Sequence, residues 1–402
     1  LMVAGLLSSS GSQHAWQRRT RLGSESDRRE RGMSDCLLRF CFKRGSANFF
    51  ITILAVCALI YVAVYLFTAS EVIMDETYGR AAIEAGEAQF REHEIERACS
   101  SVSGICYRVV DSVVPGMPPT VVRRELFTEG AGDDDSETCV MLKPPREDDT
   151  FNESDTRFWS VSHSRIVSAY VSALAVAPFV LGPIPLIEQE PNQRPPYQVL
   201  SIGLGGGNLD MFWMQLKKNM NVTVVEKDDT VVDLAHAWFG VKEMSRRDDE
   251  KGGDERRTVI ADGIDFIMRE SKRPVQYDVI AIDACDLDKD RPCPASSFLK
   301  RDVISAIDTI LSPNGVVVVN VLPLAETPNT LVDEVVTTLL TAFNSCARLT
   351  VQNELNVVVS CTKKVTSGSK DYAKFLRMRM STAMKTLGLD DIITGVVTGK
   401  RR

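Results

Sequence analysis

The segment from Tyr197 to Ser360 alternates continuous apolar runs with stretches of helical periodicity, and this alternation limits the chain to few folds. Continuous apolar runs are typical of strands that are buried on both faces. Strands that alternate with helices form a parallel sheet covered by helices on both sides. The expected strands cover residues 199–202, 221–225, 258–261, 277–282 and 316–320, and the expected helices cover 208–217, 229–239, 264–271, 297–311 and 331–343.

Two further strands are expected at the end of this segment, over 347–352 and 356–360. They are joined by about three residues, whereas a parallel crossover needs roughly a dozen, so they must form an antiparallel hairpin. A doubly wound α/β sheet that finishes in a reversed strand resembles the Rossmann-like fold of class I methyltransferases.

The N-terminal part contains a long run without any charged residue, from Gly45 to Ser70. A transmembrane helix needs about 20 predominantly apolar residues, so residues 47–69 are expected to span a membrane once. A buried core helix is the alternative. Lys43 and Arg44 precede the run and acidic residues follow it. The positive-inside rule then predicts a single-pass membrane protein, with the basic tail 1–46 in the cytosol and the rest of the chain in the lumen or outside the cell.

Four parts are expected beyond the span. Residues 70–98 are rich in Glu and Ala and are expected to form a helical stalk. Short β-type runs, separated by Gly, Pro and Asp, indicate a small antiparallel module over 99–157. The strand–helix segment belongs to a larger domain, residues 158–362, which begins with a helix over 161–180. Residues 363–402 are expected to form a C-terminal helix and a tail.

A Gly-rich turn, Gly203-Leu-Gly-Gly-Gly-Asn208, lies between the first strand and the first helix of the alternating segment. Glycines allow positive φ angles and let the backbone approach a ligand closely. Gly203, Gly205 and Gly207 are therefore candidate cofactor-binding residues. Asn208 replaces the third glycine of the dinucleotide fingerprint, so that fingerprint fails. A tight turn without a ligand is the alternative interpretation.

Acidic residues follow the next three expected strands. Glu226 ends the second strand, where an acid can bind the two ribose hydroxyls of an adenosine. Asp262, followed by Gly263, ends the third strand, where it can accept from the adenine amino group. Asp283 ends the fourth strand. Ligands of open α/β sheets bind outside the carboxyl ends of the strands. These residues and the three glycines therefore predict a site for an adenosyl cofactor, although any single acid fits a helix cap equally well.

The segment Asp283-Ala-Cys-Asp286 is the candidate catalytic element. One carboxylate can hold the amino or methionine part of the cofactor, while the other holds, or takes a proton from, an amine that attacks the sulfonium carbon. A polar loop without chemical function is the alternative. Cys285 has no convincing His partner for nucleophilic catalysis, and His163 fits a capping or helix-surface position as well as a substrate contact. With four His residues and no HxxxH or HxH spacing, no metal site is expected.

The charge balance argues against one class of partner. Residues 71–402 carry 38 basic and 50 acidic side chains. Nucleic-acid affinity begins with Lys and Arg side chains that neutralise phosphates. Nucleic acid is therefore not expected as a partner.

The cysteines are informative about the compartment. An oxidising lumen would permit disulfides, and an odd number of cysteines would leave at least one thiol free. No CxxC pair is present, so a structural zinc site is not expected. Seven of the ten cysteines lie beyond the expected membrane span: Cys99, Cys106, Cys139, Cys285, Cys293, Cys346 and Cys361.

Over roughly residues 158–362, the motifs also resemble a known family in their order along the chain. They are Gly203-Leu-Gly-Gly-Gly, Val225-Glu226-Lys-Asp, Ala235-His-Ala-Trp-Phe-Gly240, Ile260-Ala-Asp-Gly-Ile-Asp265, Tyr277-Asp-Val-Ile, Cys293-Pro-Ala-Ser-Ser-Phe298 and Asn314-Gly-Val-Val-Val-Val-Asn320. The series is similar to the spermidine-synthase-like branch of the class I methyltransferases, and most similar to the C-terminal domain of the elongation factor 1-alpha lysine and N-terminal methyltransferases.

This resemblance implies S-adenosyl-L-methionine as the cofactor and an amine of a protein or small molecule as the methyl acceptor. Polyamine synthases of the same branch carry an Asp within the glycine motif where this chain has Asn208, and Asp-Ser-Ser-Asp-Pro where it has Asp283-Ala-Cys-Asp-Leu287. Methyl transfer is therefore expected over aminopropyl transfer. An inactive membrane scaffold of the same fold is a further alternative, and a homodimer is left open.

Overall fold

The computed structural model describes residues 92–129, 136–187, 195–245, 254–286, 292–323 and 328–400. These residues belong to one compact unit, residues 83–402. The predicted basic tail (1–46), the predicted membrane span (47–69) and most of the predicted stalk lie outside the described residues. Within the described ranges, no helix is both long enough and apolar enough to cross a membrane.

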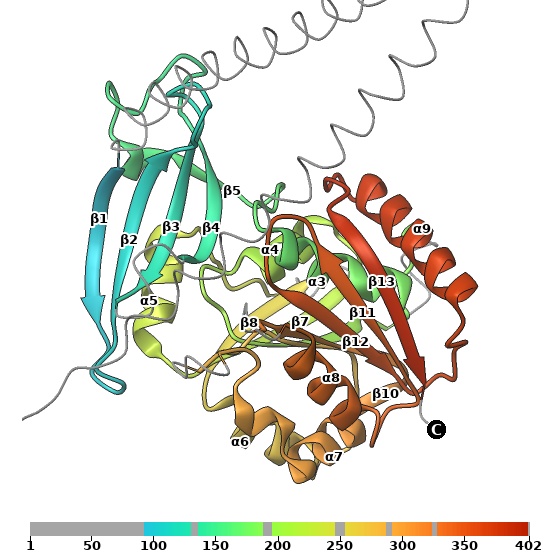
Figure 1. Ribbon diagram of the computed structural model, residues 1–402. Helices are drawn as coiled ribbons and strands as arrows, with labels where there is room; N and C mark the ends of the chain where they lie inside the picture. Colours follow the sequence, from blue (N-terminus) through green and yellow to red (C-terminus); the bar gives the residue numbers. More distant parts are fainter. Residues whose placement is uncertain are drawn as a thin grey trace, which may run out of the picture. The chain divides into compact units, whose positions relative to one another are not determined.

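The first part of the described chain is a five-stranded antiparallel sheet, here called the β module (Figure 1). Its strands lie side by side in chain order: β1 (Glu92–Cys99), β2 (Cys106–Val113), β3 (Val122–Thr128), β4 (Ser136–Lys143) and β5 (Ser160–Ser162). The stalk prediction is wrong for residues 92–98, which form a strand. Glu and Ala favour a helix in isolation, but pairing with β2 satisfies the backbone groups of β1 instead. The β module thus begins before residue 99 and extends beyond residue 157.

The larger domain contains a mixed eight-stranded sheet in the order β13-β11-β12-β10-β9-β6-β7-β8. The first five of its strands in chain order are mutually parallel, while β12 runs antiparallel to β10 and to β11. The predicted doubly wound sheet with a reversed strand and a closing hairpin is therefore confirmed. The strands are β6 (Tyr197–Ile202), β7 (Met220–Glu226), β8 (Glu255–Ile260), β9 (Tyr277–Ile282), β10 (Leu311–Val321), β11 (Ser345–Val351), β12 (Val357–Thr362) and β13 (Ile393–Lys400).

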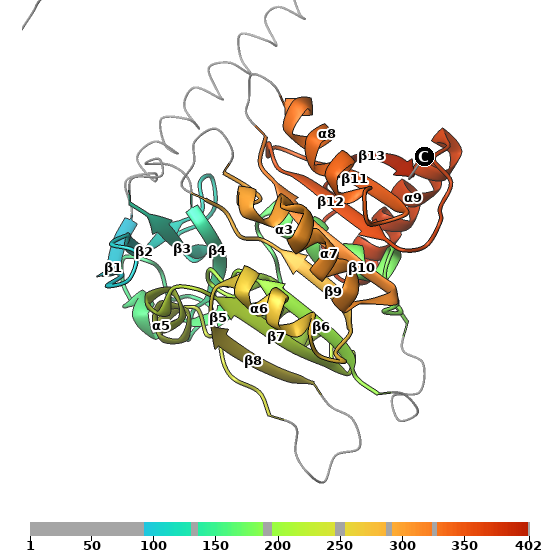
Figure 2. The ribbon, with the colours of Figure 1, turned by 90° about the horizontal axis from the view of Figure 1, so that it is seen from below.

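Helices cover both faces of this sheet, as Figure 2 shows from below. On one face, α3 (Ala169–Val180), α4 (Asn208–Gln215), α5 (Asp229–Trp238) and α9 (Lys370–Thr386) contribute to one apolar cluster with the sheet. On the other face, α6 (Gly263–Glu270), α7 (Arg301–Ile310) and α8 (Pro328–Leu339) pack against a second cluster. The helix predicted over 161–180 begins only at Ala169, because residues 160–162 pair with β4.

The C-terminal region differs from its prediction. The expected helix is present as α9, but the expected tail forms strand β13, which pairs antiparallel with β11. Buried side chains Leu376, Met380 and Met384 place α9 against the core. The last described residues are therefore part of the sheet, and the larger domain does not end at residue 362.

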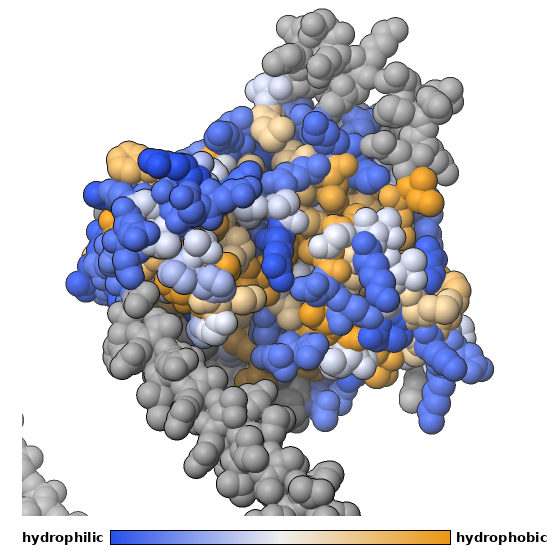
Figure 3. Space-filling view, turned by 90° about the horizontal axis from the view of Figure 1, so that it is seen from above, coloured by the Kyte–Doolittle hydropathy of each residue, from blue (hydrophilic) through white to orange (hydrophobic). Residues whose placement is uncertain are grey.

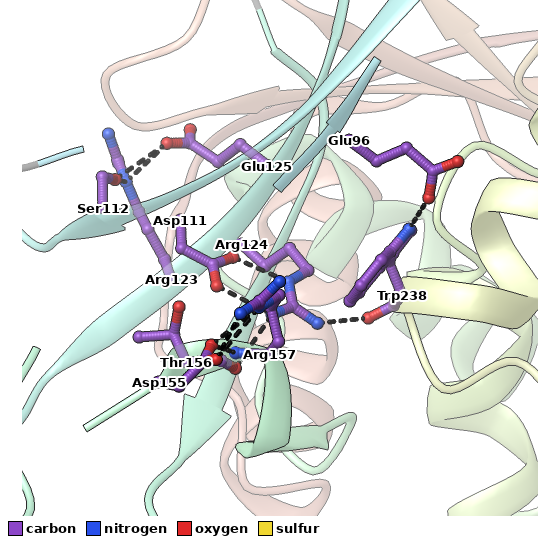
Figure 4. Close-up of polar contacts among 10 residues, drawn as sticks. All are labelled: Glu96, Asp111, Ser112, Arg123, Arg124, Glu125, Asp155, Thr156, Arg157 and Trp238. Carbon is purple, nitrogen blue, oxygen red and sulfur yellow. Dashed lines mark hydrogen bonds and ion pairs between the residues drawn. The ribbon is translucent and has the colours of Figure 1, made fainter. Parts of the chain in front are cut away.

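Arg124 of β3 attaches the β module to the larger domain (Figure 4). Its guanidinium is buried and binds both oxygens of Asp111, each at 2.7 Å. It also donates to the backbone carbonyls of Trp238 at 2.8 Å and of Thr156 at 3.0 Å. Trp238 ends α5, and its indole N–H donates to Glu96 of β1. A fully buried cation with this set of partners joins β2, β3 and α5 into one rigid contact.

The seven cysteines beyond the predicted span form three disulfides and leave one free thiol. The disulfides join Cys99 to Cys106, Cys285 to Cys293 and Cys346 to Cys361. The remaining thiol, Cys139, is buried. The expectation that an odd cysteine count leaves a thiol free is thus confirmed.

Candidate functional site

The Gly-rich turn connects β6 to α4, and its glycines are required by geometry. Gly203, Gly205 and Gly207 all have positive φ angles, of 96°, 51° and 70°. A Cβ atom at Gly203 would lie 2.2 Å from the carbonyl oxygen of Asp283, so no larger residue fits between β6 and β9. Gly203 and Gly205 line a cavity, whereas Gly207 does not; it precedes α4 in a left-handed conformation. The turn therefore brings bare backbone to the cavity wall.

Glu226, at the end of β7, faces the same cavity with a preorganised carboxylate. One oxygen accepts from the backbone N–H of Leu204 at 3.0 Å, and the other accepts from those of Lys227 and Asp228 at 2.8 and 3.0 Å. Burial nevertheless raises the pKa of Glu226 above its ordinary value. These three bonds leave one lone pair free, on the oxygen that accepts from Leu204. That oxygen can thus accept a further hydrogen bond from a ligand's hydroxyl group.

Asp262 and Gly263 lie where β8 ends and α6 begins. Asp262 is the N-cap of α6, and its Oδ1 accepts from the backbone N–H of Ile264 at 2.8 Å and of Asp265 at 3.1 Å. Asp262 is therefore a helix cap, which was the alternative interpretation of this acid. Both Asp262 and Gly263 also line the cavity. A Cβ atom at Gly263 would lie 2.6 Å from a methyl carbon of Ile202, so this position also requires glycine.

Asp283 and Asp286 line the cavity from the loop that follows β9. Asp283 Oδ1 accepts from Asn320 Nδ2 at 2.8 Å, and Asp286 Oδ2 accepts from the backbone N–H of Ser296 at 3.2 Å. Cys285, between the two acids, is bonded to Cys293, so it has no thiol for nucleophilic catalysis. This disulfide holds the acidic loop against the segment that precedes α7.

The cavity has a volume of about 980 Å³, the upper end of the range for small-molecule sites. Seven of the eight predicted site residues line it, all except Gly207. That they bind a cofactor stays a prediction.

Seen from above, the β module shows mostly hydrophilic side chains at the left, and apolar surface gathers toward the middle and right (Figure 3).

The β module and the β11–β12 hairpin supply the rest of the wall, which sequence patterns did not reveal. Glu125 of β3 is buried at the cavity, and this burial raises its pKa although Arg123 lies 2.8 Å away. Thr138 of β4 accepts from the N–H of Gly206 at 2.9 Å and ties the β module to the Gly-rich turn. Glu354 and Asn356 line the cavity from the hairpin. Only long-range pairing brings these residues to the site, so no local pattern marks them.

Asn208 and His163 take different positions. Asn208 is 6% exposed and lines the cavity at the start of α4; its Nδ2 donates to the carbonyl of Cys139 at 3.0 Å. Its Oδ1 has no hydrogen-bond partner within the described part of the chain. His163 is buried, its Nε2 lies 2.8 Å from the carbonyl oxygen of Phe239, and burial lowers its pKa. His163 is absent from the cavity wall. Asn208 is thus the polar group that a ligand could satisfy.

Within the ranges that the structure covers, no three His, Cys, Asp or Glu side chains are grouped to hold a metal ion.

A Gly-rich turn after the first strand of a doubly wound sheet, with acids at the next three strand ends, is typical of a Rossmann-like ligand-binding domain. Residues 181–378 match the family model described as "Spermine/spermidine synthase domain". The chain therefore contains a spermine/spermidine synthase-like domain.

Curated relatives carry the same region. The chain is 29% identical over 175 residues to an eEF1A lysine and N-terminal methyltransferase homolog of Drosophila pseudoobscura pseudoobscura, a match that covers 43% of this chain and 24% of the relative. It is 33% identical over 130 residues to the eEF1A lysine and N-terminal methyltransferase of Bos taurus, covering 31% of this chain and 17% of the relative. The chain spans about a quarter or less of the length of these relatives. Their names give them a protein acceptor.

Solved structures are also similar. A probable spermidine synthase from Corynebacterium glutamicum has a TM-score of 0.50 at 12% identity, covering 77% of this chain and 90% of its own, and supports the fold alone. Human methyltransferase-like protein 13, solved in complex with SAH, is 25% identical with a TM-score of 0.44, covering 56% of this chain and 94% of its own. The family match and the curated relatives thus show similarity both to spermidine synthases and to methyltransferases.

Proposed function

We propose that this protein is a membrane-anchored, S-adenosylmethionine-dependent methyltransferase that acts on an amine of a protein or small molecule. The observation that carries the proposal is the convergence of the Gly-rich turn and four acids of the strand ends on one cavity. S-adenosylmethionine, when bound, supplies a methyl group activated by a sulfonium. The cavity is large enough for an adenosyl cofactor and part of an acceptor.

Each residue of the strand ends has a proposed part in holding the ligands. Glu226 accepts from a ribose hydroxyl through its remaining lone pair, and Asp262 accepts from the adenine amino group. Backbone at Gly203 and Gly205 lets the cofactor approach β6 closely. Asp283 and Asp286 hold the methionine ammonium and the acceptor amine, and one of them takes the proton that the amine loses. These groups fit the cofactor because they present acceptors to each of its donor groups.

Asn208 supports methyl transfer over aminopropyl transfer. Decarboxylated S-adenosylmethionine, the aminopropyl donor, lacks the carboxylate of S-adenosylmethionine and carries one more net positive charge. A carboxylate at this position would favour that additional charge, whereas the neutral amide of Asn208 does not. The Oδ1 atom, which lacks a partner among the described residues, can accept one N–H bond from either ligand.

The membrane and compartment parts of the proposal rest on separate observations. The uncharged run of residues 45–70 has the length of one span. Three disulfides are typical of a lumenal or extracellular domain, which agrees with a cytosolic N-terminus. An acceptor in that compartment differs from a cytosolic elongation factor. Protease treatment of sealed microsomes tests this: protection of residues 83–402 supports the orientation, and their digestion contradicts it.

The activity is tested first by calorimetric titration of the full chain, purified in detergent, with S-adenosylmethionine and S-adenosylhomocysteine. We expect both to bind, and Glu226→Ala to weaken binding by about 1–3 kcal/mol, the worth of a charge-assisted hydrogen bond. Asp371→Ala, which removes an exposed acid on α9, is the matched control and should bind normally. A folded chain that binds neither ligand would contradict the proposal and favour the inactive scaffold.

A further inference from the structure

A line of three polar side chains crosses the sheet from the acidic loop to the β11–β12 hairpin. Asn356, just before β12, donates from Nδ2 to Asn320 Oδ1 at 2.9 Å. Asn320, near the end of β10, donates from its own Nδ2 to Asp283 Oδ1 at 2.8 Å. The three residues are far apart in sequence, and the sheet order β12-β10-β9 brings them into neighbouring strands.

The chemistry of the groups sets the direction of this line. An ionised carboxylate only accepts hydrogen bonds, so Asn320 must present its NH₂ group to Asp283 and its oxygen to Asn356. Asn320 is 2% exposed, so water does not replace a lost partner without cost. Asp283 therefore fixes which way the Asn320 amide faces, and Asn356 holds the amide there by donating to its oxygen. The Asn320 amide in turn commits one oxygen of Asp283 to the protein.

The same hairpin also holds the opposite wall of the cavity. Both oxygens of Glu354 accept from the backbone at the start of α3, from Ala169 N–H and Tyr170 N–H at 2.7 Å each. Tyr170 lines the cavity. Glu354 and Asn356 lie two residues apart in the hairpin. Glu354 contacts α3, and Asn356 contacts Asn320 of β10, which in turn contacts the acidic loop. One short connection between β11 and β12 thus contacts both walls of the cavity.

We propose that Asn320 and Asn356 are positioning residues for Asp283, and that the β11–β12 hairpin sets the orientation of the Asp283 carboxylate in the cavity. This inference rests on the proposed function only in assigning Asp283 to ligand binding. Asn356 lines the cavity itself, but its effect on Asp283 passes through the buried Asn320 amide.

The decisive variant is Asn356→Asp, which keeps the shape of the side chain but replaces a donor with an acceptor. The Asn320 amide then lies between two carboxylates that compete for its NH₂ group, and in either orientation its oxygen faces an acceptor that repels it. We expect the affinity of the full chain for S-adenosylmethionine, measured by calorimetry, to fall about tenfold. Gln352→Glu makes the same amide-to-acid change at an exposed position of the same hairpin and should leave the affinity unchanged.

Rescue distinguishes a directional role from a loss of structure. Asn356→Gln keeps the donor and should retain more affinity than Asn356→Asp. The double variant with Asn356→Asp and Asp283→Asn reverses every hydrogen bond of the line. It should recover the thermal stability that either single variant loses, while its affinity stays low because the carboxylate has moved out of place.

Three outcomes would overturn the inference. These are normal affinity in Asn356→Asp, an equal loss in Gln352→Glu, and thermal effects of Asn356→Asp and Asp283→Asn that simply add in the double variant. If the wild-type chain binds no adenosyl ligand, the proposed function fails by itself. The thermal coupling between positions 283 and 356 then still decides whether the hairpin positions Asp283.

Discussion

The cavity has two rims of different origin. The strand-end rim consists of the Gly-rich turn and the acids at or shortly after the ends of β7, β8 and β9. The far rim consists of residues from the β module and the β11–β12 hairpin, such as Glu125 and Glu354. The first rim carries the groups that suit an adenosine, whereas the second is supplied by elements outside the parallel strand ends. Acceptor choice is therefore expected to reside in the far rim.

The largest expected effect comes from breaking the contact between the β module and the larger domain. Arg124→Met removes a buried guanidinium and leaves Asp111, which is fully buried, without its ion-pair partner. We expect the free energy of unfolding in urea to fall by about 3–5 kcal/mol. Arg157→Met, which breaks an exposed pair with Asp155, is the control and should leave it unchanged. Equal effects in the two variants would show that Arg124 does not anchor the far rim.

Asn208→Asp should change the choice of cofactor. We expect S-adenosylmethionine to bind about tenfold more weakly and decarboxylated S-adenosylmethionine to gain relative affinity, because the new carboxylate repels the methionine carboxylate. Calorimetric titration with both ligands measures the ratio. Asn344→Asp makes the same exchange at an asparagine outside the cavity wall and should keep the wild-type ratio. An unchanged ratio in Asn208→Asp would show that Asn208 does not contribute to the choice between the two cofactors.

Acid should weaken ligand binding through Glu226. Burial raises the pKa of Glu226 above its ordinary 4.5. A raised carboxyl pKa adds stability to the folded chain only when the group is protonated, fully so below pH 4.5, and that contribution is lost as the pH rises through the folded-state pKa. Binding requires the ionised form, so the affinity for S-adenosylmethionine should decline as the pH falls, and the decline should begin at a higher pH than for an ordinary glutamate. The Glu226→Gln variant should be insensitive, and a wild-type affinity that is equally insensitive would contradict this.

The smallest expected effect concerns the thiol beside the far rim. Burial raises the pKa of Cys139 to about 12, so the reactive thiolate is scarce at neutral pH. Iodoacetamide at pH 8 should leave Cys139 unmodified in the native chain and modify it after unfolding in guanidinium, as peptide mass spectrometry would show. Rapid modification of the native chain would mean that the far rim opens in solution.

The two rims also differ in how far the sequence predicts them. Continuous apolar strands and the turn glycines are local signals, so the sheet, its reversed strand and the acids of the strand ends could be predicted. The strand at 92–98 could not, because its Glu-rich sequence favours a helix until β2 pairs with it. The strand over 393–400 was not predicted because Gly395 and Gly399 weaken its strand character, and pairing with β11 stabilises it. Asn320 lies in an apolar strand and reveals its contacts only in three dimensions.

Strand β13 and helices α3 and α9 bear on how the domain can be dissected. The family match covers residues 181–378, which begins after α3 ends at Val180 and stops inside α9. A fragment cut at those limits would lose α3, which is almost entirely buried, and half of α9, which covers the same sheet face, and it would also lose the edge strand. Its exposed sheet surface would favour aggregation. Truncation experiments that follow homology limits would thus report an insoluble protein and conceal a functional one.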